Sequence, residues 1–177
     1  MKHPLERLAT GLALTGLAML AIGGLGAAAG IRVNTSPSIP LGFYGISAEP
    51  VVRGAYVLVC PPAWDVFEEA RSRGYIGAGP CPGGYGYLMK RVLGVSGDDI
   101  AVADEGVFIN GHLQPRSTLR TRDGAGRPLP KITHRYRLAD ADLLLMSEAS
   151  ETAFDGRYFG PVPRANVEAV IRPILTW

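Results

Sequence analysis

One apolar run in the chain reads Tyr87-Leu88-Met89-Lys90-Arg91-Val92-Leu93 and has the character of a β-strand. Successive side chains of a strand point to opposite faces, so Leu88, Lys90 and Val92 are predicted to share one face. The residues between them then share the other face. The run therefore predicts a strand that carries an amine among apolar neighbours.

Further short runs of apolar or alternating residues, bounded by Gly, Pro or Asp, predict a mainly β, antiparallel domain. The pair Asn110-Gly111 within residues 107–113 is a strong hairpin signal, because Asn-Gly favours the tight turn between antiparallel strands. One short helix is predicted at Ala63–Arg73, ended by Gly74. The other predicted strands are Gly42–Ser47, Ala55–Cys60, Tyr87–Val95, Asp99–Ala103, Tyr136–Leu138, Leu143–Ser147 and Val167–Leu175.

The composition excludes several classes of protein. The 177 residues are 47% hydrophobic and 19% charged, with a net charge of +2, so nucleic acid is excluded as the main partner and disorder is excluded as the main state. The 23 Gly and 14 Pro favour a loop-rich β protein over a helical bundle. The two cysteines are too few for a disulfide scaffold.

The N-terminal segment is predicted to cross a membrane. No charged residue occurs from Leu8 to Ile31, and a helix of that length reaches roughly 36 Å, against a hydrocarbon core of about 30 Å. Lys2 and Arg7 precede the run and indicate a cytoplasmic N-terminus. Residues 1–31 are thus expected to be a tail and anchor, and residues 32–177 an extracytoplasmic domain. The alternatives are a buried helix of a soluble protein and a cleavable signal peptide, with Leu8–Ile22 as its apolar stretch.

A polar segment interrupts the predicted strands at Ser117–Arg137. From Arg116 to Arg137 the chain has seven Lys or Arg and one acid, Asp123. We interpret this part as a solvated loop or a small excursion, about residues 104–140. The alternative is a surface that contacts anionic lipid headgroups or an acidic partner.

Cys60 and Cys81 flank the predicted helix. Outside the cytoplasm such a pair is more often bridged than free, so a structural disulfide is a candidate. A metal site would need His112 or His134 without a recognisable ligand spacing, and none is predicted. No cofactor motif is found either.

The lysines point to one catalytic candidate. The chain has fifteen arginines but only three lysines, of which Lys90 alone lies in an apolar strand. Removal from water favours the neutral amine and lowers its pKa, which an arginine does not permit. The alternative is a lysine whose stem packs on the sheet while its head group reaches water.

The candidate nucleophile is Ser38, in a segment rich in Ser, Thr and Pro just after the apolar run. Pro37 and Pro40 fix the backbone on both sides of it, and a nucleophile needs rigid presentation. Ser36 could supply a hydroxyl to an oxyanion hole beside the Ser38 amide. The alternative is a plain linker between membrane and domain.

In combination these segments resemble the type I signal peptidase superfamily, and most closely the conjugative transfer peptidases of the TraF type. The motifs that carry the resemblance are Thr35-x-Ser-x-Ser-Ile-Pro-x-Gly-x-Tyr44, Cys60-Pro61-Pro62, Arg71-Ser72-Arg73-Gly74-Tyr75, Cys81-Pro82-Gly83-Gly84, the box that begins at Lys90 and ends at Asp98, and the box that begins at Phe154 and ends at Pro163.

The resemblance implies a barrel-like antiparallel sheet, as in a signal peptidase catalytic domain, and roles for individual residues. Ser38 matches the catalytic serine, Lys90 the catalytic lysine and Ser36 the oxyanion-hole hydroxyl. Asp155 and Arg157 match a pair that supports the site. Two positions depart from the family pattern: Ala153 stands where a serine often bonds the lysine, and Gly156 where serine is usual. Thr152 or a water would then orient Lys90.

The expected function is that of a membrane-anchored serine endopeptidase, with its domain in the periplasm. It would process an exported precursor, a pilin-like subunit of a conjugation system, through an acyl-enzyme that water or a substrate amine opens. The expected partners are this precursor and the lipid bilayer. The alternatives are a general leader peptidase and a catalytically inactive, membrane-bound interaction module.

Overall fold

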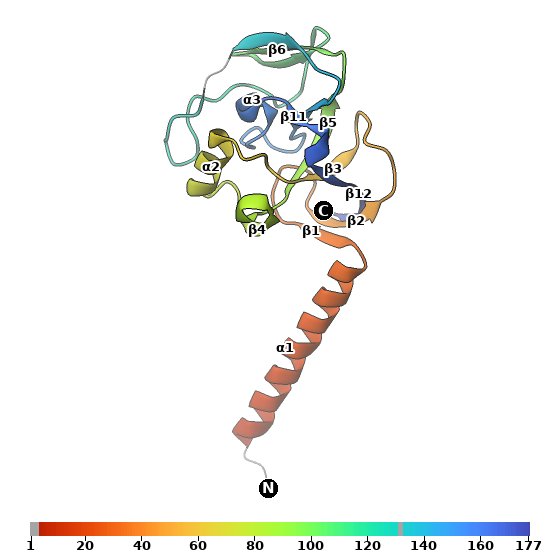
Figure 1. Cartoon of the computed structure of the whole chain (residues 1–177). Coiled ribbons are helices and arrows are strands. Elements are labelled where there is room, and N and C mark those ends of the chain that lie inside the picture. The colour runs from red at the N-terminus through yellow and green to blue at the C-terminus, as the bar shows by residue number, and fades with distance from the viewer. Residues whose placement is uncertain (1–3, 131–132) are drawn as a thin grey trace.

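The structure, a computed structural model, describes residues 4–130 and 133–177. A long helix, α1 (Pro4–Ala28), leads away from a β domain that holds the rest of the described chain (Figure 1). Lys2, on which the predicted orientation depends, and Lys131 of the excursion lie outside the described residues.

Two antiparallel sheets form the domain. The larger curls into a half-barrel, with strand order β1-β2-β12-β3-β5-β10-β11, and the smaller has the order β8-β7-β6-β9. The strands of the larger sheet are β1 (Ile31–Asn34), β2 (Gly42–Ser47), β3 (Tyr56–Val59), β5 (Leu88–Gly94), β10 (Asp142–Met146), β11 (Val162–Pro163) and β12 (Val167–Thr176). Those of the smaller are β6 (Asp99–Ala103), β7 (Gly106–Ile109), β8 (His112–Leu113) and β9 (His134–Arg137).

Short elements cover the sheets. They are α2 (Asp65–Ser72), β4 (Ala78–Cys81), α3 (Gly156–Phe159) and two 3₁₀ turns, η1 (Pro82–Gly84) and η2 (Arg164–Asn166). The main core lies between α2, α3 and the centre of the larger sheet, where Phe67 and Phe159 pack with ring centroids 5.0 Å apart. A second core joins β10 to the smaller sheet. The prediction of a mainly β, antiparallel domain with an N-terminal apolar helix and a short helix is confirmed.

The end of α1 differs from the prediction. The apolar run continues to Ile31, but the helix ends at Ala28, and Ile31 already pairs with Gly45 of β2. Gly30 has φ +81, a left-handed conformation that ends a helix at little cost to glycine. The predicted anchor therefore includes the first residue of the first strand.

The predicted hairpin turn and helix end have the expected geometry. Asn110 (φ 51) and Gly111 (φ 81) connect β7 to β8 with the two positive φ angles of a type I′ turn. Helix α2 is shorter than predicted, and Gly74 (φ 78) follows its end. Alternation alone did not predict β1, β4, β11 or α3, because each is too short to show a period.

The excursion folds back onto the domain. It contributes β7, β8 and β9 to the smaller sheet, and residues 114–130 run as an irregular loop toward α2 (Figure 1). The Asp123 carboxylate accepts hydrogen bonds from the Tyr75 hydroxyl and from the Arg127 backbone and guanidinium. The Arg127 guanidinium also lies 5.5 Å from the Tyr75 ring centroid. The loop is thus fixed against the C-terminal end of α2.

Candidate active site

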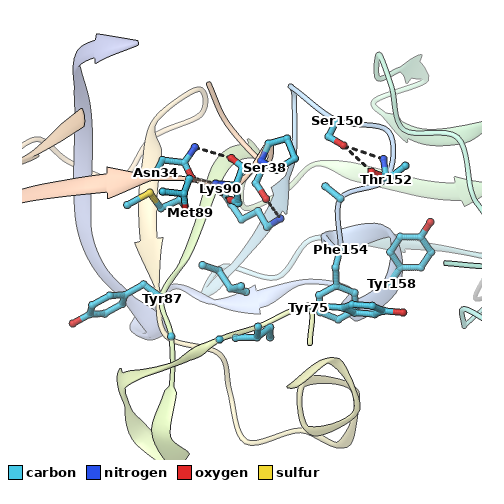
Figure 2. A pocket seen from close by; sticks show the side chains of 18 of the residues that line it. Asn34, Ser38, Tyr75, Tyr87, Met89, Lys90, Ser150, Thr152, Phe154 and Tyr158 are labelled. Atoms are coloured by element: carbon cyan, nitrogen blue, oxygen red, sulfur yellow. Dashed lines mark hydrogen bonds between the residues drawn. The ribbon is translucent and has the colours of Figure 1, made fainter. Parts of the chain in front are cut away.

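Ser38 and Lys90 come together from separate parts of the fold. Ser38 lies in the loop between β1 and β2, and Lys90 lies in β5, opposite Val57 of β3. Their hydroxyl and amine are hydrogen-bonded, with Oγ and Nζ 3.0 Å apart (Figure 2). The predicted alternation of the strand is confirmed, since Leu88, Lys90 and Val92 are buried and the residues between them are half-buried.

The Lys90 amine is removed from water. The residue is 2% exposed, and desolvation is the largest of the effects that lower its pKa from 10.5 to about 8. The Asp155 carboxylate opposes the decrease and the Arg157 guanidinium adds to it. A substantial fraction of Lys90 is therefore neutral slightly above neutral pH, as a general base requires.

The Ser38 loop is held by a buried asparagine that sequence analysis did not single out. The Asn34 amide donates to the carbonyl oxygens of Ser36, Ile39 and Pro40 at 2.8, 2.9 and 3.0 Å. Its carbonyl oxygen accepts from the Ser36 backbone at 3.1 Å. An asparagine that bonds the backbone a few residues ahead is a known way to build a turn, and that signal was present in the sequence.

Ser36 lines the same cavity as Ser38, and its hydroxyl already has a partner. Ser36 Oγ lies 3.0 Å from Asn34 Oδ1, to which it donates a hydrogen bond. Near a substrate, this proton could turn from Asn34 to an oxygen in the cavity. The arrangement leaves Ser36 able to supply one side-chain donor beside the Ser38 amide.

A buried ion pair supports Ser38 through Ser147. Asp155 and Arg157 are fully buried and bidentate, with contacts of 2.8 and 2.9 Å. Asp155 also accepts the Ser147 backbone N–H at 3.0 Å, and Ser147 Oγ donates to the Ser38 carbonyl oxygen at 2.6 Å. The carboxylate is therefore linked to the backbone of the candidate nucleophile through a single residue, which sequence analysis missed.

The structure places Thr152, which was expected to orient Lys90, and explains the departure from the family pattern at Gly156. Thr152 Oγ1 lies 3.0 Å from Ser150 Oγ, so the structure engages this hydroxyl with Ser150 and not with Lys90 (Figure 2). A Cβ at Gly156 would lie 2.7 Å from Leu144 Cδ1 and 2.9 Å from the Leu145 carbonyl oxygen. Close packing of α3 on β10 therefore requires glycine there.

A cavity of about 750 Å³ surrounds Ser38 and Lys90. Asn34, Tyr87 and Met89 lie on one side of the pair, and the aromatic rings of Tyr75, Phe154 and Tyr158 lie on the other (Figure 2). The rings of Tyr75 and Phe154 pack against each other with centroids 5.6 Å apart and an interplanar angle of 44°. The cavity is mainly apolar and large enough for several residues of an extended peptide.

The two cysteines are joined close to one side of this cavity. Cys60 and Cys81 form a disulfide with Cα atoms 5.4 Å apart, and it ties β4 to the end of β3. Residues 77–80, next to Cys81, line the cavity. Among the residues that the structure describes, no group of three or more His, Cys, Asp or Glu could hold a metal ion.

Known proteins are similar to the chain over nearly its whole length. The family described as signal peptidase, peptidase S26 matches residues 6–177. Plasmid transfer protein TraF from Escherichia coli is 53% identical over 178 residues, which are 100% of both chains. Probable conjugal transfer protein TraF from Sinorhizobium fredii is 37% identical over 170 residues, covering 94% of this chain and 89% of the relative. A crystal structure of a signal peptidase I from Enterococcus faecalis is 18% identical, with a TM-score of 0.40, and covers 71% of this chain and 100% of that one.

Proposed function

Because the chain belongs to the signal peptidase family, peptidase S26, we propose that it is a membrane-anchored serine endopeptidase with Ser38 as nucleophile and Lys90 as general base. The observation that carries the proposal is the 3.0 Å contact between Ser38 Oγ and a Lys90 amine that is 2% exposed. A buried lysine with a lowered pKa, in contact with a hydroxyl at the centre of a cavity, is the arrangement that activates a serine without histidine.

The proposed reaction has two steps. The neutral Lys90 amine takes the proton of Ser38 Oγ as the oxygen attacks the substrate carbonyl carbon, and the resulting ammonium gives that proton to the leaving amine. An ester between Ser38 and the N-terminal part of the substrate remains. Lys90 then removes a proton from water, or from a substrate amine, as this nucleophile attacks the ester carbonyl carbon, and the ammonium returns this proton to Ser38 Oγ as the ester bond breaks. Water gives a free carboxylate, and an amine of the same chain gives a closed ring.

The oxyanion of the tetrahedral intermediate would be held by two donors. These are the Ser38 backbone N–H and the Ser36 hydroxyl. The hydroxyl would turn from its present acceptor, Asn34 Oδ1, and donate its hydrogen bond to the substrate oxygen. The backbone of the loop is fixed by Asn34 and Ser147, so little reorganisation accompanies this exchange. The buried pair of Asp155 and Arg157 has a supporting role and does not touch the substrate in this proposal.

The substrate we propose is a pilin-like precursor of a conjugative transfer system. The relatives at 53% and 37% identity are named as plasmid and conjugal transfer proteins, which favours this over a general leader peptidase. The paired Ser38 and Lys90 favour an enzyme over an inactive interaction module.

The proposed location is the inner membrane, with residues 1–31 as cytoplasmic tail and anchor and residues 32–177 in the periplasm. Helix α1 is long and apolar enough to cross a membrane from Glu6 to Ala28, a property that a signal sequence shares. The disulfide supports an oxidising compartment. Strands β1 and β2 lie at the end of the domain that α1 enters (Figure 1). Exposed apolar side chains of β1, β2 and β12, such as Val33, Phe43 and Ile174, support contact with lipid.

The proposal is tested by co-expressing the full chain with a pilin precursor of a conjugative transfer system and measuring the mass of the product. We expect a cut precursor with the wild type and an uncut one with Ser38→Ala and with Lys90→Met. A product lighter by one further water would report ring closure. Processing that persists in either variant would rule out the proposed pair.

A further inference from the structure

The far side of the cavity, where Tyr75 and Tyr158 lie, has a basic border. Arg120 and Arg122 of the excursion loop line the cavity there. The Arg120 backbone N–H lies 3.2 Å from the Tyr158 hydroxyl oxygen and donates to it. The excursion loop therefore reaches the cavity at Arg120.

This border is held in place by interactions outside the cavity. The buried Arg157 guanidinium donates to the carbonyl oxygens of Arg116 and Thr118, both at 3.1 Å, where the loop begins. Further along, Arg73 of the α2 C-terminus donates to the Pro128 carbonyl oxygen at 2.7 Å. Arg120 and Arg122 thus lie in a segment whose two ends are both fixed by hydrogen bonds.

The charges at the border are not balanced. Asp123 is the one acidic residue among those that line the cavity, and its carboxylate is occupied by Tyr75 and Arg127. Within the described part of the chain, the structure pairs neither Arg120 nor Arg122 with a carboxylate. Arg122 donates to the Gly126 carbonyl oxygen at 2.7 Å, which leaves further N–H groups of its guanidinium for a ligand.

We infer that Arg120 and Arg122 form a subsite that binds a carboxylate of the substrate peptide, at a fixed distance along the peptide from the bond that is cut. The inference rests on the proposed function, since it assigns a substrate class to the same cavity. A guanidinium presents a planar fork of donors that matches a carboxylate, and both arginines are exposed at the border of the cavity, where a substrate can reach them. The carboxylate comes from an Asp or Glu side chain or from the end of the peptide chain.

The test uses the full chain in detergent and a peptide library made by digesting a bacterial proteome. Mass spectrometry of the cut peptides gives the residues preferred at each position. We expect wild type to enrich Asp and Glu at one position, and Arg120→Glu/Arg122→Glu to lose this preference and to favour Lys or Arg there. The matched control is Arg135→Glu/Arg137→Glu, which makes the same change of charge on exposed residues of β9 outside the cavity and should retain the wild-type preference.

Kinetics on single peptides identify the source of the carboxylate. Replacing the preferred Glu by Gln should lower kcat/KM about fivefold for wild type and less than twofold for Arg120→Glu/Arg122→Glu. If amidation of the peptide C-terminus has this effect instead, the chain terminus is the ligand. Cutting that requires Ser38 but shows no carboxylate preference would overturn the inference and leave the proposed function intact. The absence of any cutting that requires Ser38 would instead overturn the proposed function.

Discussion

Replacing Lys90 by methionine should make the protein more stable while it abolishes activity. The folded protein has to hold an amine that is 2% exposed, and the pKa of this amine falls from 10.5 to about 8. A pKa difference of one unit corresponds to about 1.4 kcal/mol. Holding the protonated Lys90 amine in the folded protein therefore lowers the free energy of unfolding by about 3 kcal/mol at pH 7. The lost hydrogen bond to Ser38 offsets about 1 kcal/mol. Lys90→Met is therefore expected to gain about 2 kcal/mol at pH 7.

The sign of the pH dependence follows from the same values. Below pH 8 both the folded and the unfolded wild type are protonated at Lys90, and the full cost is present. Between pH 8 and 10.5 the unfolded chain binds a proton that the folded protein does not, so wild-type stability rises with pH. The advantage of Lys90→Met should thus shrink by about 2 kcal/mol between pH 7 and pH 9.5.

Urea unfolding of the full chain in detergent, followed by tryptophan fluorescence at the two pH values, measures both quantities. Lys131→Met is the control for loss of a lysine elsewhere in the sequence. The reasoning is refuted if Lys90→Met is less stable than wild type at pH 7, or if its advantage is the same at both pH values. For wild-type activity, kcat/KM should rise about tenfold from pH 7 to pH 9, as the neutral amine becomes the major form.

Three further predictions concern the support of the site. Ser147→Ala should lower kcat about tenfold and change KM less than twofold, because the Ser38 carbonyl oxygen loses its 2.6 Å donor. Steady-state kinetics measure both constants, and Ser147→Thr should recover most of the rate. An equal loss of rate in Ser147→Ala and Ser147→Thr would contradict the assignment. Gly156→Ala should reduce the unfolding free energy by about 1–3 kcal/mol, since its Cβ would lie 2.7 Å from Leu144 Cδ1; denaturant unfolding that matches wild type would contradict this packing. Cys60→Ser/Cys81→Ser should lose about 3 kcal/mol in the same assay, and wild-type protein treated with a reductant should match it.

Much of the fold could be predicted because the deciding signals are local. Alternation in residues 87–93 placed Lys90 on a buried face, and the Asn110-Gly111 pair defined a turn by its φ angles alone. The position of Ser38 between two prolines likewise identified a rigid loop. Each of these follows from a residue and its immediate neighbours in sequence.

The support of the site could not be predicted in this way. Ser147 is separated from Ser38 by 109 positions, and the two come together through the strand order of the whole larger sheet. The end of α1 was misplaced because hydropathy does not distinguish the last helical residue from Ile31, which begins a strand. The contact of Thr152 with Ser150 likewise depends on the fold of the whole turn.

The strand order also makes the candidate site depend on a strand far from it in sequence. Strand β12 inserts between β2, which follows the Ser38 loop, and β3, which pairs with the Lys90 strand. Without residues 167–176 the larger sheet would have a gap between β2 and β3. A truncation that removes these residues would therefore separate the two halves of the candidate site, although neither Ser38 nor Lys90 is altered.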